Sequence, residues 1–347
     1  MLAVKVTFKD AEDIKKFLLA NSLYDKNFVF KKDKKNIFFP IKNEESRQII
    51  IDKFPKTIFE EIELESRDSP SNLKEALQEK LSEEELDLLK TSFDVVGTIA
   101  ILEIDPPLDK KQKLIAETIL KIHKGIKTVV RKADKHDGTF RTQKMEFIAG
   151  EKTLETIHKE NNIQLFLNVQ EVYFSTRLST ERKRISQIIK PKEKILVMFS
   201  GCAPYPCVFS KNTEADQIVG IEINPKGHDY GIKNIEINKL TNITLINGDV
   251  KEIIPDLIKQ TNQKFDRILM PLPKSAEDFL DAALIAAKKH SIIHFYAFLH
   301  EDNFHEAHDA IAKACKKNKL DHKIIRTVKC GQHAPRVYRI CVDFEVL

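Results

Sequence analysis

The chain of 347 residues is long enough for two or three domains, and its formal net charge of +5 permits nucleic-acid binding without requiring it. Five cysteines, an odd number without a CxxC pair, argue against a disulfide framework and a zinc site. Because no apolar run is long enough for a membrane span or a signal peptide, we expect a soluble, cytoplasmic protein.

The first expected unit is a small α/β module over residues 1–67. Apolar residues alternate over 2–8, as on a half-buried strand, and residues 11–19 have the spacing of an amphipathic helix. The apolar run at 37–41 predicts a further strand. These elements are enough for a module that can stand alone.

A linker is expected next, across residues 68–92. Serine, aspartate and proline make a turn-rich joint at residues 66–71. The highly charged stretch 73–89 has leucines at helical spacing, which predicts one long helix. So polar a helix should bury little surface.

The middle domain is expected over residues 93–186. The sequence predicts one strand at 94–103, a helix at about 110–123, and strands near 128–131 and 140–148. Strands and a helix without regular βαβ alternation indicate an α+β domain.

The last domain, residues 187–347, alternates strands and helices and ends in an antiparallel hairpin, which predicts an α/β fold with a mainly parallel, Rossmann-like sheet. Its first strand, from Lys194, runs into a small-residue turn at Gly201 and Ala203. The next two strands end near Glu222 and Asp249, and a fourth ends at residues 268–273.

These strand ends predict a cofactor site, because ligands of open parallel sheets lie outside the carboxyl ends of the strands. Glu222 can accept hydrogen bonds from ribose hydroxyls, and Asp249 can accept one from an adenine amino group. The turn lacks the third glycine of a dinucleotide fingerprint, and no phosphate cradle is apparent. We therefore expect an adenosyl cofactor without phosphates, S-adenosylmethionine.

Several linked segments extend this pattern through the chain. They are Phe140–Glu151, Thr156–Asn161, Val172–Leu178, Glu181–Arg182, Asp266–Lys274 and Ala334–Tyr338. In order and spacing they resemble the archaeal and eukaryotic tRNA guanine-N1 methyltransferases, which modify the guanosine at tRNA position 37. The resemblance covers nearly the whole chain. It implies a class I Rossmann-like methyltransferase domain, tRNA bound at its anticodon loop and outer corner, and the N-terminal module at that corner. We expect a monomer without a metal.

The resemblance also implies catalytic roles. Guanine N1 carries a proton, so its methylation requires a base, and negative charge develops toward O6. Family precedent makes Glu181 the general base, Arg141 the group that stabilises charge on O6, and Tyr173 a wall of the base pocket. The cofactor residues that it implies are Arg182, Phe199, Gly201, Ala203, Glu222, Ile223, Asp249, Val250, Pro271 and Leu272.

Three positions depart from the family pattern: Val197 replaces an acid, Ala203 a glycine, and Pro271 the asparagine of an Asn-Leu-Pro motif. Proline offers no side-chain amide, so hydrogen bonds from that asparagine are lost. One alternative is therefore methyl or aminocarboxypropyl transfer to a wyosine-type precursor at the same tRNA position. A second is a tRNA-binding protein that has lost catalysis.

Overall fold

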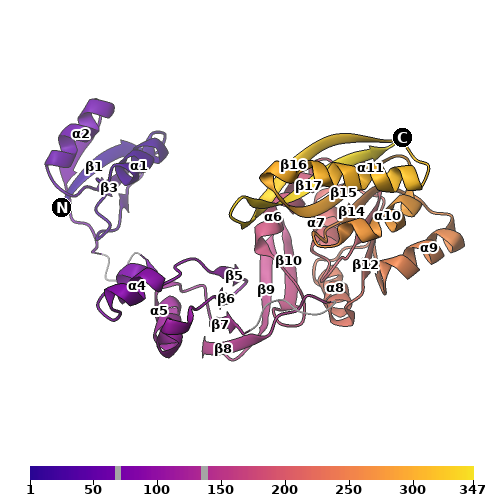
Figure 1. Cartoon of the computed structure of the whole chain (residues 1–347). Helices are drawn as coiled ribbons and strands as arrows, with labels where there is room; N and C mark the ends of the chain where they lie inside the picture. The colour runs from indigo at the N-terminus through magenta and orange to yellow at the C-terminus, as the bar shows by residue number, and fades with distance from the viewer. Residues whose placement is uncertain (67–71, 134–139) are drawn as a thin grey trace. The chain divides into compact units, whose positions relative to one another are not determined.

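The computed structural model describes residues 1–66, 72–133 and 140–347 (Figure 1). The chain forms two compact units. One consists of Met1–Thr91 and Ile104–Lys124, and the other of Ser92–Glu103 and Gly125–Leu347. Among the described residues, no helix is long and apolar enough to cross a membrane.

The N-terminal module is a four-stranded antiparallel sheet with two helices. In the order β2-β3-β1-β4, its strands are Lys31–Lys32, Asn36–Pro40, Leu2–Thr7 and Ile58–Glu61. The helices are α1 (Ala11–Ala20) and α2 (Glu45–Lys53). Val4, Leu18, Phe39 and Ile50 are buried in one core cluster made only of residues from this module. The predicted strands at 2–8 and 37–41 and the helix at 11–19 are confirmed.

The single helix predicted over residues 73–89 is wrong. Two short helices, α3 (Leu73–Leu77) and α4 (Glu83–Leu88), occupy this stretch. Ser82 starts the second with a capping box, in which its hydroxyl accepts from the Glu85 amide and the Glu85 carboxylate accepts from the Ser82 amide. Leu73, Leu77 and Leu81 are buried, so this stretch contributes to a core. The helix predicted at 110–123 is present as α5 (Gln112–Ile122), after a 3₁₀ turn.

The second unit begins with a small sheet of order β5-β6-β7-β8. Its strands are Asp94–Val96, Ile99–Leu102, Thr128–Lys132 and Met145–Gly150. The strand predicted over 94–103 is thus two antiparallel strands, because Gly97, with φ of +55°, turns the chain between them. The strand predicted at 140–148 starts only at Met145. A separate hairpin follows, β9 (Glu155–Glu160) with β10 (Ile163–Asn168).

A seven-stranded sheet of order β13-β12-β11-β14-β15-β17-β16 forms the rest. Its strands are β11 (Lys194–Met198), β12 (Gln217–Glu222), β13 (Ile243–Asn247), β14 (Phe265–Met270), β15 (Ala287–His300), β16 (His322–Ala334) and β17 (Val337–Val346). Strands β11 to β15 pair in parallel, and β17 is antiparallel to both neighbours. The predicted α/β fold, with its closing hairpin, is confirmed.

Helices cover both faces of this sheet (Figure 1). They are α6 (Ser179–Ser186), α7 (Pro204–Asn212), α8 (Pro225–Ile237), α9 (Val250–Thr261), α10 (Leu280–Ala286) and α11 (His305–Lys317). Along β11, Leu196 and Met198 join the core cluster under α9, α10 and α11, whereas Ile195 and Val197 join the cluster with α7 and β10. Both faces of the strand are therefore buried, which leaves its carboxyl end as the open edge.

Candidate functional site

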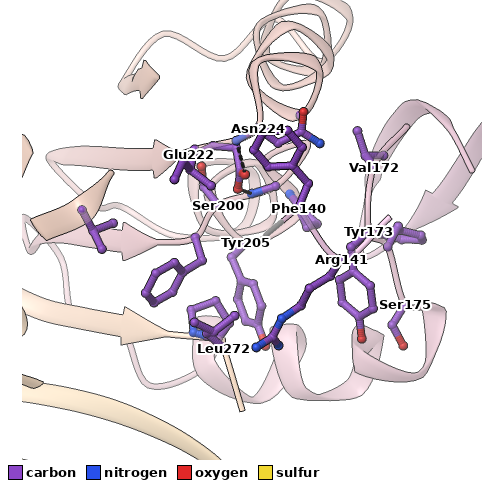
Figure 2. Close-up of a pocket in the computed structure, with 18 of the residues that line it drawn as sticks. Phe140, Arg141, Val172, Tyr173, Ser175, Ser200, Tyr205, Glu222, Asn224 and Leu272 are labelled. Carbon is purple, nitrogen blue, oxygen red and sulfur yellow. Dashed lines mark hydrogen bonds between the residues drawn. The ribbon is translucent and has the colours of Figure 1, made fainter. Parts of the chain in front are cut away.

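A cavity of about 370 Å³ lies at the carboxyl ends of β11, β12 and β14 (Figure 2). Phe199, Gly201, Glu222 and neighbouring strand-end residues line one side. In Figure 2 Val172 and Tyr173, from the segment after β10, lie across the opening from Ser200 and Glu222. All of the predicted cofactor residues except Ala203 line this cavity, and so do Arg141 and Tyr173. Its size suits a small organic ligand.

The loop after β11 lines the cavity with Phe199, Ser200 and Gly201. Phe199, Gly201 and Ala203 all have φ between +55° and +63°. Ala203 is buried at the N-cap of α7, and its left-handed conformation costs about 1 kcal/mol relative to glycine. This strain gives a physical reason for the glycine that the family pattern has there.

Glu222 ties this loop to the neighbouring strand. Its carboxylate accepts from the backbone N–H of Gly201 at 2.6 Å and from that of Asn224 at 2.8 Å. Burial raises the pKa of Glu222, and the amide hydrogen bonds only partly oppose that change. Each carboxylate oxygen can still accept from a ligand, because an oxygen has more than one acceptor position.

The third and fourth strands complete the cofactor side of the cavity. Asp249 caps α9 by accepting from the Lys251 amide at 2.8 Å, and it lines the cavity beside Val250. The rings of Phe199 and Phe279 meet edge to face at 4.9 Å, which makes an apolar wall. The acidic side chains can bind the hydroxyls of a sugar, and the apolar wall can pack against a flat purine ring.

Arg182 shapes the wall of the cavity. It is 1% exposed, and its guanidinium donates to Glu160 at 2.5 and 2.6 Å and to the Ser175 carbonyl at 3.0 Å. It also lies over the rings of Phe174 and Tyr205. Burial acts to raise the pKa of Glu160, but hydrogen bonds from His158 and Arg182 outweigh it and leave the pKa lowered. The charge of Arg182 is therefore already matched by a buried carboxylate.

Arg141 and Tyr173 stand where this cavity meets a second one of about 550 Å³, since both side chains line the two cavities. Arg141 donates to the Lys274 carbonyl at 3.1 Å, and Arg339 donates to the Tyr173 hydroxyl at 3.1 Å. Burial lowers the pKa of Arg141. In Figure 2 the side chain of Arg141 runs past Tyr173 toward the end of the cavity where Tyr205 lies.

The structure does not bring Glu181 to this cavity: it is absent from the described lining residues. The side chain is 4% exposed and accepts from the Tyr296 hydroxyl at 2.6 Å. Arg184 donates to both of its carboxylate oxygens at 2.7 Å and to Asp343 at 2.8 Å. Glu181 is thus a buried, fully partnered carboxylate.

Asp343 continues this network into the sheet. His294 contacts it at 2.6 Å through Nδ1, and the other ring nitrogen of His294 lies 2.8 Å from Arg267. Because arginine can only donate, Nε2 accepts and the proton of a neutral ring is on Nδ1. His294, Cys341 and Asp343 are close enough to hold a metal ion, but the network already supplies positive charge from Arg184 and Arg267. Ion pairing therefore accounts for the cluster better than a metal does.

Several lining residues were not predicted from the sequence: Tyr205, Asn224 and Phe279 all face the cavity. Asn224 was detectable, because it precedes a proline directly after a strand and caps α8. Phe279 had no local signal, because it is the last residue of a 3₁₀ turn, Ala276–Phe279, that follows the short loop after β14.

Comparison with known proteins identifies the family. Along 99% of both chains, the protein is 34% identical to tRNA (guanine(37)-N(1))-methyltransferase Trm5b of Pyrococcus abyssi. The chain belongs to the TRM5/TYW2 methyltransferase family. The model of the TRM5/TYW2 methyltransferase domain matches residues 156–324. Those of the TYW2 N-terminal domain and the tRNA methyltransferase 5 N-terminal domain match 73–153 and 3–50.

Solved structures of the family have the same fold. The crystal structure of Trm5b from Pyrococcus abyssi aligns with 100% of this chain and 99% of its own, with a TM-score of 0.74 and 33% identity. A complex of aTrm5 with tRNALeu aligns with 99% of each chain, with a TM-score of 0.69 and 30% identity. A Nanoarchaeum equitans relative, tRNA (guanine(37)-N(1))/4-demethylwyosine(37)-methyltransferase Taw22, is 34% identical over 74% of this chain and 100% of its own.

Proposed function

We propose that this protein transfers the methyl group of S-adenosylmethionine to N1 of the guanosine at position 37 of tRNA. The observation that carries the proposal is similarity along 99% of the chain to a guanine-37 N1-methyltransferase. It is supported by a cavity at the sheet edge that joins the strand-end acids to Arg141 and Tyr173. A family member bound to tRNA supports tRNA as the substrate.

The cofactor is assigned to the side of the cavity made by the sheet. Glu222 suits the ribose hydroxyls and Asp249 the adenine amino group, while Phe199, Val250 and Leu272 supply apolar contacts. When bound, S-adenosylmethionine supplies a methyl group on a positively charged sulfur. Pro271 offers its carbonyl as an acceptor in place of the family's asparagine side chain.

The target base is assigned to the junction of the two cavities. Arg141 can donate to guanine O6 there, which stabilises the charge that develops as N1 loses its proton. Tyr173 is partly exposed at the same junction and can stack on the base. Because a stacked base hides its reacting edge, the guanosine has to leave the anticodon loop to reach this place.

Glu181 is assigned as the base that finally receives the N1 proton. Its bonds from Arg184 and Tyr296 hold the carboxylate in one orientation. The variant Glu181→Gln keeps the size of the side chain but removes the basic oxygen. We expect methyl transfer in a single turnover to slow by about 10² or more, with S-adenosylmethionine binding unchanged.

Glu214→Gln is the control for that experiment, because Glu214 is an exposed glutamate of the same domain. Calorimetry with the cofactor and single-turnover assays with tRNA would be run on both variants. A Glu181→Gln enzyme as fast as the wild type would remove Glu181 from the mechanism.

Binding of tRNA is assigned to the N-terminal module and to the basic segments 121–135, 182–194 and 313–323, apart from Arg182 and Arg184, which are held in ion pairs. A cytoplasmic location and a monomeric state belong to the same proposal. The relative Taw22 is named as a methyltransferase of both guanine 37 and 4-demethylwyosine 37. A 4-demethylwyosine-type precursor should therefore also be tested as a substrate of this chain. The direct assay is therefore one that separates the two substrates.

A further inference from the structure

The second cavity, of about 550 Å³, has no part in the reaction as assigned so far. Arg141 and Tyr173 line both cavities, so an RNA strand that places its guanosine between them continues toward the second one. All of its described lining residues belong to the compact unit that carries the large sheet. Its size suits a further small organic group, such as one nucleotide.

The lining of this cavity carries more positive than negative charge. Among its described residues, five are lysine or arginine and two are acidic. Glu103 accepts a hydrogen bond from Lys132 at 2.6 Å, and Asp94 pairs with Arg177 at 2.9 Å. Both acids are therefore already matched by two of the five cations.

Lys274, Arg339 and Arg141 are the other three cations of the lining. Within residues 1–66, 72–133 and 140–347, no carboxylate forms an ion pair with Lys274 or Arg339. The charge of Arg339 acts together with burial to lower the pKa of Arg141. Cations that repel one another and are not offset by acids favour an anion, such as an RNA phosphate.

An aromatic stack stands at the same cavity. The ring of His333, near the end of β16, lies on that of Phe298 from β15, with centroids 4.1 Å and planes 24° apart. The Arg339 guanidinium lies 5.0 Å from the centre of the Phe298 ring. His333 is exposed, and all three side chains line the cavity. Unstacked RNA bases stack on flat side chains of this kind.

We propose that the second cavity binds a nucleotide next to the target guanosine, with its base stacked on His333 and its phosphate near Lys274 and Arg339. The inference rests on the proposed function, which takes the guanosine out of the anticodon loop. Its neighbours in the strand then lose a stacking partner. His333 replaces that partner, and the two cations replace the counterions of the phosphate.

Arg339 connects this subsite with the pocket for the target base. It lies against Phe298, and its Nη2 donates to the Tyr173 hydroxyl at 3.1 Å. A nucleotide bound beside Arg339 therefore also fixes the side chain that holds Tyr173.

The first test removes the flanking base and the stacking ring, separately and together. Affinities of the wild type and His333→Ala are measured for intact tRNA and for tRNAs that are abasic directly before or directly after position 37. For one of these positions, the abasic tRNA and the His333→Ala variant should each weaken binding about tenfold. The two changes together should weaken it no further, because both remove the same contact.

His305→Ala is the control, at an exposed histidine outside the described cavity lining, and it should bind intact tRNA like the wild type. The abasic position that shows the coupling identifies the bound nucleotide. Calorimetric binding of S-adenosylmethionine should be unchanged in both variants.

The second test measures the salt dependence of tRNA affinity. Lys274→Gln removes the charge but keeps the carbonyl that accepts from Arg141. The slope of log affinity against log salt concentration should become shallower by about 0.7. Lys289→Gln, at an exposed lysine outside the described cavity lining, should keep the wild-type slope.

Three results would each overturn the subsite: unchanged tRNA affinity in His333→Ala, additive losses with both abasic tRNAs, or an unchanged salt slope in Lys274→Gln. All three are binding measurements and do not depend on methyl transfer. Absence of N1-methylguanosine with the wild-type enzyme would instead remove the proposed function itself.

Discussion

Two acids with buried side chains, Glu160 and Glu222, show that the hydrogen-bond partner of a carboxylate decides the direction of its pKa shift. Glu160 faces the guanidinium of Arg182, and its pKa is lowered despite burial. Glu222 faces only backbone amides, and burial leaves its pKa raised. Glu160 is therefore held ionised as the partner of Arg182, whereas Glu222 itself lines the cavity and is the acid whose environment a ligand can change most.

His294 makes stability depend on pH. Burial, with Arg267 and Arg184, lowers its pKa although Asp343 acts to raise it. Below about pH 6.5 this histidine is protonated in the unfolded chain but stays neutral in the folded one. The free energy of unfolding therefore falls as the pH falls.

We expect His294→Gln to remove this dependence. Between about pH 7.5 and about pH 5.5, the urea-derived free energy of unfolding should fall by about 1 kcal/mol more for the wild type than for the variant. His305→Gln, at an exposed histidine, should behave like the wild type. Equal pH dependence in wild type and His294→Gln would contradict the neutral, buried ring.

Residue-scale prediction from the sequence succeeded where a side chain follows a strand. Glu222 and Asp249 each follow an apolar run, and parallel strands bring their ends to one edge. The surroundings of Glu181 were beyond such reasoning, because Tyr296 lies 115 residues further along the chain.

At the scale of elements, the tight turn between β5 and β6 depends on Gly97. A Cβ there would lie 2.2 Å from the Thr156 hydroxyl and 2.5 Å from the Ile157 carbonyl oxygen, and φ is +55°. Gly125 has nothing within 4 Å of its Cβ position and no left-handed φ. The two glycines differ in what an added methyl group would meet.

Gly97→Ala should therefore lower the free energy of unfolding by about 2 kcal/mol or more, through overlap and backbone strain. Gly125→Ala is the matched control and should leave it nearly unchanged. Urea unfolding of both variants makes the comparison. Similar stabilities would show that β9 moves aside without cost.

Two element boundaries were predicted wrongly because the spacing of apolar residues was given more weight than local turn and capping signals. Leucines at helical spacing favour one helix over 73–89, but Ser82 and Glu85 have the spacing of a capping box and begin a new helix. Gly97 within a run of β-branched residues likewise marked a turn. The parallel strands were predicted well, because a short apolar run between two helices is typical of a strand that is buried on both faces.

On the scale of the whole molecule, the N-terminal module is separable. Its core cluster, which includes Val4, Leu18, Phe39 and Ile50, contains only its own residues. The large sheet and its cavity lie in the other compact unit. Cofactor binding should thus not need residues 1–66.

A variant without residues 1–66 is expected to bind S-adenosylmethionine like the full chain and to bind tRNA more weakly. Calorimetry and a tRNA-retention assay across salt concentrations measure the two affinities. The full chain serves as the control. Unchanged tRNA affinity would contradict the assignment of this module to tRNA.

The most direct test of the central claim is nucleoside analysis of position 37. Unmodified tRNA and tRNA carrying a wyosine-type precursor are each incubated with the enzyme and S-adenosylmethionine, and the nucleosides are then identified by mass spectrometry. We predict N1-methylguanosine at position 37 of the unmodified tRNA. Unmodified guanosine there, or an aminocarboxypropyl product on the precursor, would contradict the account.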